Sequence, residues 1–325
     1  MREIVFQSVL ANRLSDFVTF KRLGGRDYRS QIRLLEYFDR FLCQEGFTGQ
    51  WPTSDLVQRY LAGTEHLQPR VRGNRFSVVR QFCSYLCQFE PLIYVPEKKL
   101  FRERRASRLP HIFTEGEIKA LLAAARDLSP PGSLRPQTYS TFFGLLWTTG
   151  LRCGEAIALN LGDVDIDRRL LYVHQGKFGK SRWVPLSLST CRVLQSYTQR
   201  RTTIGSTTRE APLFINLRHH RLHHQHIYAT FRQILRQCGL RGGKGSPGPR
   251  IHDLRHSFAC HRLLLWYREG QDVNALLPAL ATYLGHIKVT FTQVYLRATA
   301  ELLEQANKRF HHNFLHNILQ KGEQE

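Results

Sequence analysis

The chain has 325 residues, 42% of them hydrophobic, and carries a formal net charge of +21. This length allows one large or two ordinary domains with buried cores, and the charge indicates a polyanionic partner, most often nucleic acid. No apolar run approaches the ~20 residues of a membrane helix, the N-terminal residues MREIVFQSVL lack the apolar core of a signal peptide, and seven cysteines at irregular spacing do not form a disulfide framework. We therefore expect a cytoplasmic protein with reduced thiols and no membrane partner.

Residues 1–95 predict a small, all-helical domain that binds DNA. The four segments with apolar residues at helical spacing are 8–21, 29–45, 54–62 and 67–89. Three arginines, Arg70, Arg72 and Arg75, lie near the start of the fourth segment. We expect them to contact DNA, with an ordinary solvated helix face as the alternative.

Residues 96–110 form the most basic stretch of the chain. They hold six Lys or Arg and two Asp or Glu, which is a net charge of +4 in fifteen residues. We interpret them as a basic linker between two domains that would contact DNA phosphates, which position a duplex without reading its sequence. The four residues expected to make these contacts are Lys98, Lys99, Arg104 and Arg105.

Residues 111–325 predict a second domain that is helical apart from one small antiparallel sheet. Its first helix begins with a capping box, formed by Thr114 and Glu117. The further predicted helices are 137–149 and a short one in LRCGEAIALN. From residue 222 onward we again expect helices, among them one that begins at HDLR, 273–284, 290–297 and 299–316. Strands near 170–174 and 181–186, joined by a glycine-containing turn, predict a β-hairpin.

Several polar residues of this domain lie in apolar segments or at element ends, where they are candidates for chemistry. They are Arg152, Lys177, His252, Arg255, His286 and Tyr295. Two guanidinium groups can hold the non-bridging oxygens of a phosphodiester and offset the charge of its transition state. A lysine or histidine can protonate a leaving 5′-oxygen, and a tyrosine can attack the phosphorus to form a covalent ester. This chemistry requires neither metal nor ATP, so we expect no cofactor and no metal site.

The segment YLGHIKVTFTQVY sets His286 and Tyr295 nine residues apart. On one straight helix these two side chains would face apart. Gly285 is a natural helix stop, so we expect a break followed by a second helix that carries Tyr295. Because a phenol with a pKa near ~10 is a poor nucleophile at neutral pH, we also expect the cationic surroundings of Tyr295 to favour its phenolate.

In their order and context, these residues resemble the tyrosine recombinase (phage integrase) family. TTGLRCGEAIALNLGDVD resembles the family's first-arginine box, which assigns Arg152 as catalytic and Glu155 as a supporting residue. GKFGKSRWVPL resembles the family's β-hairpin segment. Its first lysine, Lys177, is the candidate general acid, and Lys180 is the alternative.

The rest of the resemblance lies further along the chain. HDLRHSFA matches the family's HxxR box and assigns His252 and Arg255, and YLGH matches the box that assigns His286. The family places its nucleophile nine residues after that histidine, where this chain has Tyr295.

The resemblance implies a helical core-binding domain and a catalytic domain of the DNA breaking-rejoining enzyme fold, which together clamp DNA. It implies a site-specific recombinase that forms a 3′-phosphotyrosyl intermediate on double-stranded DNA with paired half-sites. It also implies a homo- or hetero-tetramer in which helix 299–316 docks on a neighbouring protomer, with packing in its own chain as the alternative. The long segment between Arg255 and His286 resembles transposon-borne recombinases that act together with others of the same element. Integration or transposition of a mobile element is therefore expected.

Two other functions remain open from the sequence. A type IB topoisomerase shares related chemistry, but the separate helical N-terminal domain argues against it. A catalytically silent DNA-binding accessory subunit is also compatible with the charge, but the intact set of candidate residues argues against that reading.

Five histidines between positions 219 and 226 include pairs at the i,i+4 spacing of metal ligands. No third ligand type accompanies them at suitable spacing. We interpret them as a polar loop, at a loop–helix junction, that faces DNA or solvent.

Overall fold

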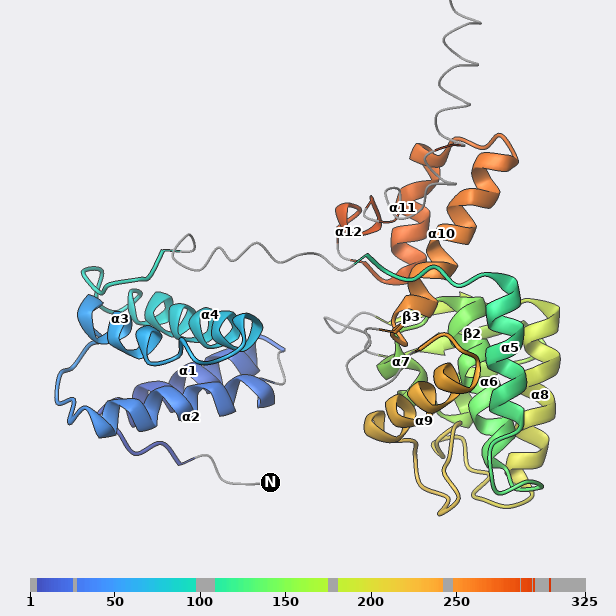
Figure 1. Cartoon of the computed structure of the whole chain (residues 1–325), viewed down its shortest axis with the longest axis horizontal. Coiled ribbons are helices and arrows are strands. Elements are labelled where there is room, and N and C mark those ends of the chain that lie inside the picture. Colours follow the sequence, from blue (N-terminus) through green and yellow to red (C-terminus); the bar gives the residue numbers. More distant parts are fainter. Residues whose placement is uncertain are drawn as a thin grey trace, which may run out of the picture. The chain divides into compact units, whose positions relative to one another are not determined.

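The computed structural model describes residues 5–25, 28–97, 109–174, 181–241, 248–286, 288–293, 295 and 304 (Figure 1). The chain divides into two compact units, residues 1–107 and residues 108–325, each with its own apolar core. None of the helices in the described ranges is long and apolar enough to cross a membrane. The mainly helical fold with one small antiparallel sheet is the predicted one.

The first unit is a bundle of helices, as predicted. They are α1 (Ala11–Leu23), α2 (Arg29–Gln44), α3 (Ser54–Ala62) and α4 (Pro69–Leu86). Phe17, Phe38 and Phe82 come from three of these helices and are fully buried, and Phe17 and Phe38 each pack against Phe82. Burial of a large apolar side chain contributes about 2 kcal/mol, so this aromatic centre holds the bundle together.

The second unit contains the remaining helices and the sheet. Its α-helices are α5 (Glu115–Arg126), α6 (Arg135–Thr149), α7 (Cys153–Ala158), α8 (Leu188–Thr202), α9 (His224–Gln237), α10 (Asp253–Arg268), α11 (Val273–Leu284) and α12 (Thr290–Gln293). A 3-10 turn, Leu161–Asp163, precedes the sheet. Helix α6 is central because it packs against α5, α7, α8 and α10. Helix α8 was not among the predicted elements.

Local sequence explains where α5 begins and where α6 ends. The capping box predicted at Thr114 and Glu117 is present, with both reciprocal hydrogen bonds formed. Helix α6 ends at Gly150, which has a positive φ of 63°. A Cβ at this position would lie 2.5 Å from the ring of Phe258, so both the backbone and the packing require glycine here.

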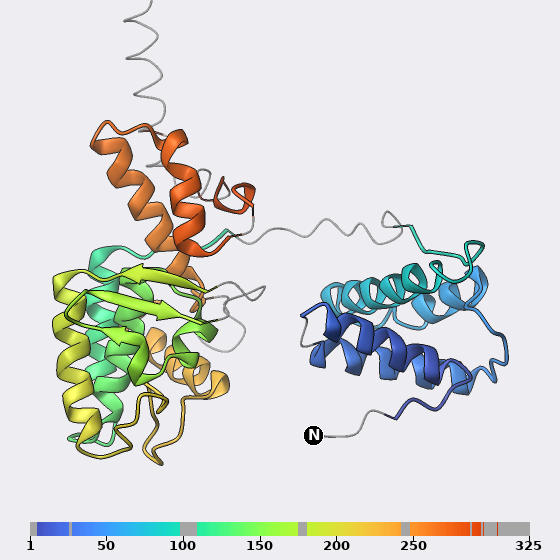
Figure 2. The same cartoon turned by 180° about the vertical axis from the view of Figure 1, so that it is seen from behind.

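The sheet has the strand order β1 (Val164–Asp165), β2 (Leu170–Val173) and β3 (Arg182–Pro185), all antiparallel (Figure 2). Strands β2 and β3 confirm the predicted hairpin, whereas β1 was not predicted. Leu171 pairs with Val184, and both side chains are fully buried. The hairpin turn, with Lys177 and Lys180, lies outside the described residues.

The last described elements confirm the break predicted between His286 and Tyr295. Helix α11 ends at Gly285, whose φ is 67°, and α12 (Thr290–Gln293) packs against α11. Helix α12 ends before Tyr295, whereas the predicted helix 290–297 included it. Tyr295 joins an apolar cluster with residues of α10 and α11. Of the predicted helix 299–316, only Glu304 lies within the described residues, so its docking stays a prediction.

Candidate active site

Arg152 lies at the first turn of α7, two residues after Gly150. Its Nη1 donates to Glu155 Oε1 at 2.7 Å, and its Nη2 donates to the carbonyl oxygen of Gly285 at 3.1 Å. The side chain is about one-fifth exposed. Arg152 thus joins the end of α11 while part of its side chain stays accessible.

Arg255, on the first turn of α10, is almost completely buried, with 1% of its surface exposed. Its Nη1 donates to Gly150 O at 2.8 Å, and its Nη2 donates to Leu284 O at 2.6 Å. Both arginines therefore hold the end of α11. Arg152 bonds the end of α11, and Arg255 bonds the ends of both α6 and α11.

Glu155 connects this pair to the sheet through Arg182, a residue that the sequence analysis did not single out. Arg182 Nη1 and Nη2 donate to the two carboxylate oxygens of Glu155 at 3.1 and 2.9 Å. Arg182 Nε also donates to Tyr283 O at 2.8 Å. The sequence shows Arg182 only as an arginine inside a predicted strand. Its contact on α11 could not be predicted, because Tyr283 is 101 positions away in the chain.

The charges around Glu155 favour its ionised form. Burial alone would raise the pKa of this carboxyl, but the hydrogen bonds and positive charges of Arg182 and Arg152 outweigh it and lower the pKa to about 2. One carboxylate thus balances only one of two guanidinium groups. With Arg255 beside them, the site keeps an excess of positive charge that suits a phosphodiester.

The two candidate histidines are neutral in the absence of DNA. His286 Nε2 lies 3.0 Å from Arg255 Nη2. Burial and the positive charges of Arg255 and Arg152 lower the pKa of His286 to about 4. Burial, His256 and Arg255 also lower the pKa of His252 to about 4, although this residue keeps an exposed edge. An incoming phosphate would oppose these shifts because its negative charge favours the imidazolium forms.

Tyr295 lies beside His256 of α10 and His286 after α11, with 3% of its surface exposed. Its ring is 6.1 Å from the ring of His286, nearly parallel to it, and 5.3 Å from the ring of His256. The positive charge of Arg255 acts on its hydroxyl. Arg152, His252, Arg255, His286 and Tyr295 are thus brought together from four separate segments of the second unit.

The expectation that the cationic surroundings favour the phenolate of Tyr295 is wrong for the DNA-free structure. Burial raises the pKa of Tyr295, and the opposing effects of Arg255 and Arg152 do not overcome it. The sequence shows which charged residues are present, but it does not show how deeply Tyr295 is buried. The tyrosine is therefore protonated at neutral pH until a substrate changes its surroundings.

The predicted DNA-binding arginines of α4 differ in their surroundings. Arg70 is exposed, whereas Arg72 forms an ion pair with Glu65 at 3.4 Å. The guanidinium group of Arg75 lies 4.0 Å from the ring centre of Tyr37. Arg70 is thus the most accessible of the three. The predicted linker residues Lys98, Lys99, Arg104 and Arg105 fall in a range that the structure does not describe.

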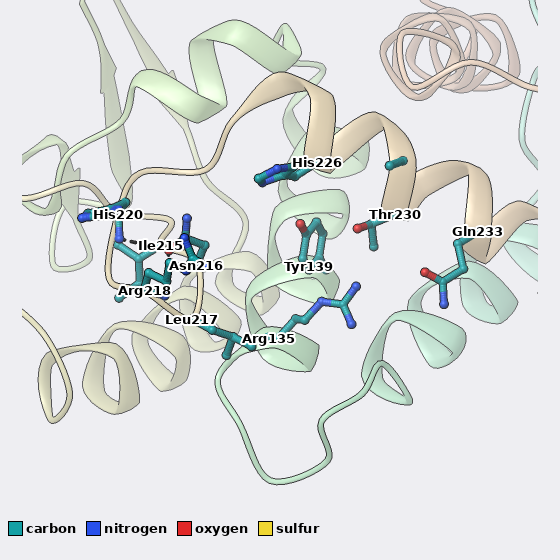
Figure 3. A pocket seen from close by; sticks show the side chains of 11 residues that line it. Arg135, Tyr139, Ile215, Asn216, Leu217, Arg218, His220, His226, Thr230 and Gln233 are labelled. Carbon is teal, nitrogen blue, oxygen red and sulfur yellow. Dashed lines mark hydrogen bonds between the residues drawn. The ribbon is translucent and has the colours of Figure 1, made fainter.

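A separate pocket of about 760 Å³ lies in the second unit between α6, α9 and the loop before α9 (Figure 3). Arg135 and Tyr139 contribute from α6, and His226 from α9. None of the candidate catalytic residues that the structure describes lines it. The five histidines of positions 219–226 are exposed at this loop–helix junction, as predicted.

The DNA-free protein is expected to lose stability as the pH falls from about 6.5 to about 4. His286 has a pKa of about 4 in the folded protein against 6.5 when unperturbed, so the unfolded chain binds more protons in this window. The free energy of unfolding therefore rises with pH there and falls on acidification. His252 adds to this dependence in the same direction, but less, because it is exposed.

Urea denaturation at several pH values between about 4.5 and 7.5 measures the free energy of unfolding across most of this pH window. The His286→Gln protein is the control, and its stability should depend less steeply on pH. A wild-type protein that is equally stable at both ends, or a His286→Gln protein with the same slope, would contradict the assignment.

Comparison with known proteins identifies the family to which this site belongs. Residues 111–301 match the model of the phage integrase family. The putative integrase/recombinase y4rB of Sinorhizobium fredii is 38% identical, covering 93% of this chain and 97% of its own. The tyrosine recombinase XerA of Pyrococcus furiosus is 30% identical, covering 98% and 99%.

The fold also matches a solved structure. The Tn1549 transposon integrase, in complex with transposon right-end DNA, aligns with a TM-score of 0.66 over 92% of this chain and 98% of its own, at 14% identity. This likeness supports the fold alone. Together with the family match over more than half of the chain, the full-length relatives establish that the chain belongs to the phage integrase family and is a tyrosine recombinase, an enzyme of site-specific DNA recombination.

Proposed function

We propose that the chain cleaves and rejoins DNA through Tyr295, with Arg152, Arg255, His252 and His286 around the scissile phosphate. The observation that carries this proposal is the position of Arg255. Its guanidinium group lies 3.0 Å from His286 Nε2, and its positive charge acts on the hydroxyl of Tyr295. It therefore links the proposed nucleophile to the proposed phosphate-binding groups.

The first step begins when the scissile phosphate binds beside Arg255 and Tyr295. Arg152 and Arg255 then hold the non-bridging oxygens, and His286 donates to one of them. The Tyr295 oxygen attacks the phosphorus and the bond to the 5′-oxygen breaks. Neutral His252 takes the phenol proton, and Lys177, with Lys180 as the alternative, protonates the leaving oxygen.

The products are a 3′-phosphotyrosyl bond and a free 5′-hydroxyl, which preserve the energy of the original phosphodiester. The same 5′-hydroxyl, or one from a second duplex, can attack the ester and release Tyr295. Attack by the second duplex exchanges the strands without a nucleotide cofactor. The arginines supply the positive charge throughout, since Glu155 and Arg182 keep Arg152 in place.

The wider assignments extend this proposal. Residues 1–95 and the linker 96–110 bind DNA, with Arg70, Arg72 and Arg75 among the contacts. The enzyme acts in the cytoplasm as a tetramer on paired half-sites, in which helix 299–316 docks on a neighbouring protomer, alone or with other recombinases of its element. Its reaction serves integration or transposition of a mobile element. The similarity to y4rB, a putative integrase/recombinase, supports this use over a topoisomerase or a silent subunit.

The proposal is tested with the DNA that flanks the gene, which would contain the half-sites of a mobile element. The purified protein is incubated with nicked fragments of this DNA in excess EDTA, and denaturation-resistant complexes are isolated and sequenced. We expect adducts at one position within inverted repeats. Cleavage that appears only after Mg²⁺ is added, or relaxation of any supercoiled plasmid without strand exchange, would contradict the proposal.

A further inference from the structure

Thr292, on α12, contacts the proposed catalytic histidine from the side away from Arg255. Its Oγ1 lies 2.9 Å from His286 Nδ1, and the residue is fully buried at 0% exposure. The opposite ring nitrogen, Nε2, is the one that lies 3.0 Å from Arg255 Nη2. Thr292 also precedes Tyr295 by only three residues, so one short segment contacts the histidine and carries the nucleophile.

These two contacts determine which ring nitrogen of His286 carries the proton. A guanidinium group has only donors, so Nε2 of the neutral ring must accept from Arg255. The proton is then on Nδ1, which donates to Thr292 Oγ1. A hydroxyl oxygen accepts through its lone pairs whatever the charge of the ring, so this bond persists when Nε2 also gains a proton.

We propose that Thr292 is a positioning residue for strand cleavage, which holds the His286 ring with Nε2 towards the phosphate and couples that ring to the nucleophile segment. The inference rests on the proposed function of His286 and Tyr295. In the DNA complex, protonated His286 donates from Nε2 to a phosphate oxygen while Nδ1 continues to donate to Thr292. Without the hydroxyl, Nδ1 would lose this acceptor, and the ring would lose its fixed orientation.

The surroundings of His286 make this acceptor important. The titratable and charged groups around the ring are Arg255 on α10, His252 just before it, Arg152 at the start of α7, Arg182 on β3, and Tyr295. The cationic groups among them disfavour the protonated ring. Thr292 Oγ1 stabilises the protonated ring, as the phosphate does, because the positive charge strengthens the Nδ1 hydrogen bond.

The test compares three variants in the adduct assay on nicked DNA. Thr292→Val keeps the shape and removes the hydroxyl, and we expect adduct formation about tenfold slower. The loss should be larger at pH 8 than at pH 6, because the ring of the variant protonates less readily. Thr292→Ser keeps the hydroxyl and should restore most of the rate. Thr290→Val, the same change at an exposed position of α12, should leave it unchanged.

A double-mutant cycle separates positioning from packing. In a His286→Gln background, Thr292→Val should cause little further loss, because the threonine acts through the histidine. Equal loss with and without His286, or equal loss in the serine and valine variants, would overturn the inference. If the valine variant does not fold, Thr292→Ala is compared with Thr292→Ser by the same criteria. A wild-type protein that forms no adduct would refute the proposed function, whereas a Thr292→Val protein as fast as wild type would refute only the role of Thr292.

Discussion

The Tyr295→Phe protein is expected to bind DNA normally and to form no covalent complex with it. The substitution removes one oxygen and keeps a ring that packs, 97% buried, in the cluster of α10 and α11. Removal of a catalytic nucleophile lowers the rate by about 10⁴-fold or more, which is below detection in a gel assay. Denaturing gels on a nicked substrate measure the adduct, and native gels on the same DNA measure binding.

Tyr267→Phe is the matched control for this prediction. Tyr267 lies on α10 and packs, partly buried, against the same apolar cluster as Tyr295, so this substitution removes the same atom from another tyrosine of the cluster. Its adduct should form at the wild-type rate. An adduct that survives in Tyr295→Phe would place the nucleophile at another residue and would require the site to be rebuilt.

Replacing Arg255 by alanine should affect both catalysis and stability. The guanidinium group is 1% exposed and donates to Gly150 O and Leu284 O, so its removal leaves two buried carbonyls without a donor. Unsatisfied buried groups cost about 1–3 kcal/mol each, so the free energy of unfolding should fall by about 3 kcal/mol. Loss of its charge at the phosphate should slow cleavage at least ~100-fold.

The Arg255→Lys variant tests whether a positive charge alone is sufficient for stability and cleavage. It keeps a positive charge but lacks the planar fork that reaches two carbonyls and a phosphate together, so cleavage should remain strongly impaired. Arg262→Ala, at an exposed position of the same helix, should change neither quantity. Urea denaturation and adduct kinetics measure the outcomes. An Arg255→Ala protein with wild-type stability and rate would show that Arg255 has neither role.

Much of the fold was accessible from the sequence because local patterns determine it. Helix α11 was predicted with its observed ends, and Gly285 marked the break before Tyr295 through its left-handed backbone. Helix α8 was missed because LSTCRVLQSYTQRRT is mostly polar and has only a few well-spaced apolar residues, such as Leu194 and Tyr197. Strand β1 has two residues, too few to produce an alternating pattern.

The candidate site was also only partly predictable from the sequence. Arg152, His252, Arg255, His286 and Tyr295 were named from their order and neighbours in the chain. Contacts between distant segments were not accessible, and these make Arg182 a partner of Glu155 and of the α11 end. Burial was not accessible either, which is why the protonation of Tyr295 was predicted in the wrong direction.

The central claim is that Tyr295 forms the bond to DNA, and mapping the adduct tests it most directly. The wild-type complex formed on nicked DNA is digested with nuclease and protease, and the peptide that retains a nucleotide is sequenced by mass spectrometry. We expect the phosphodiester on the phenolic oxygen of Tyr295, with the DNA attached through its 3′-phosphate. A nucleotide on any other residue, or attachment through a 5′-phosphate, would contradict the account.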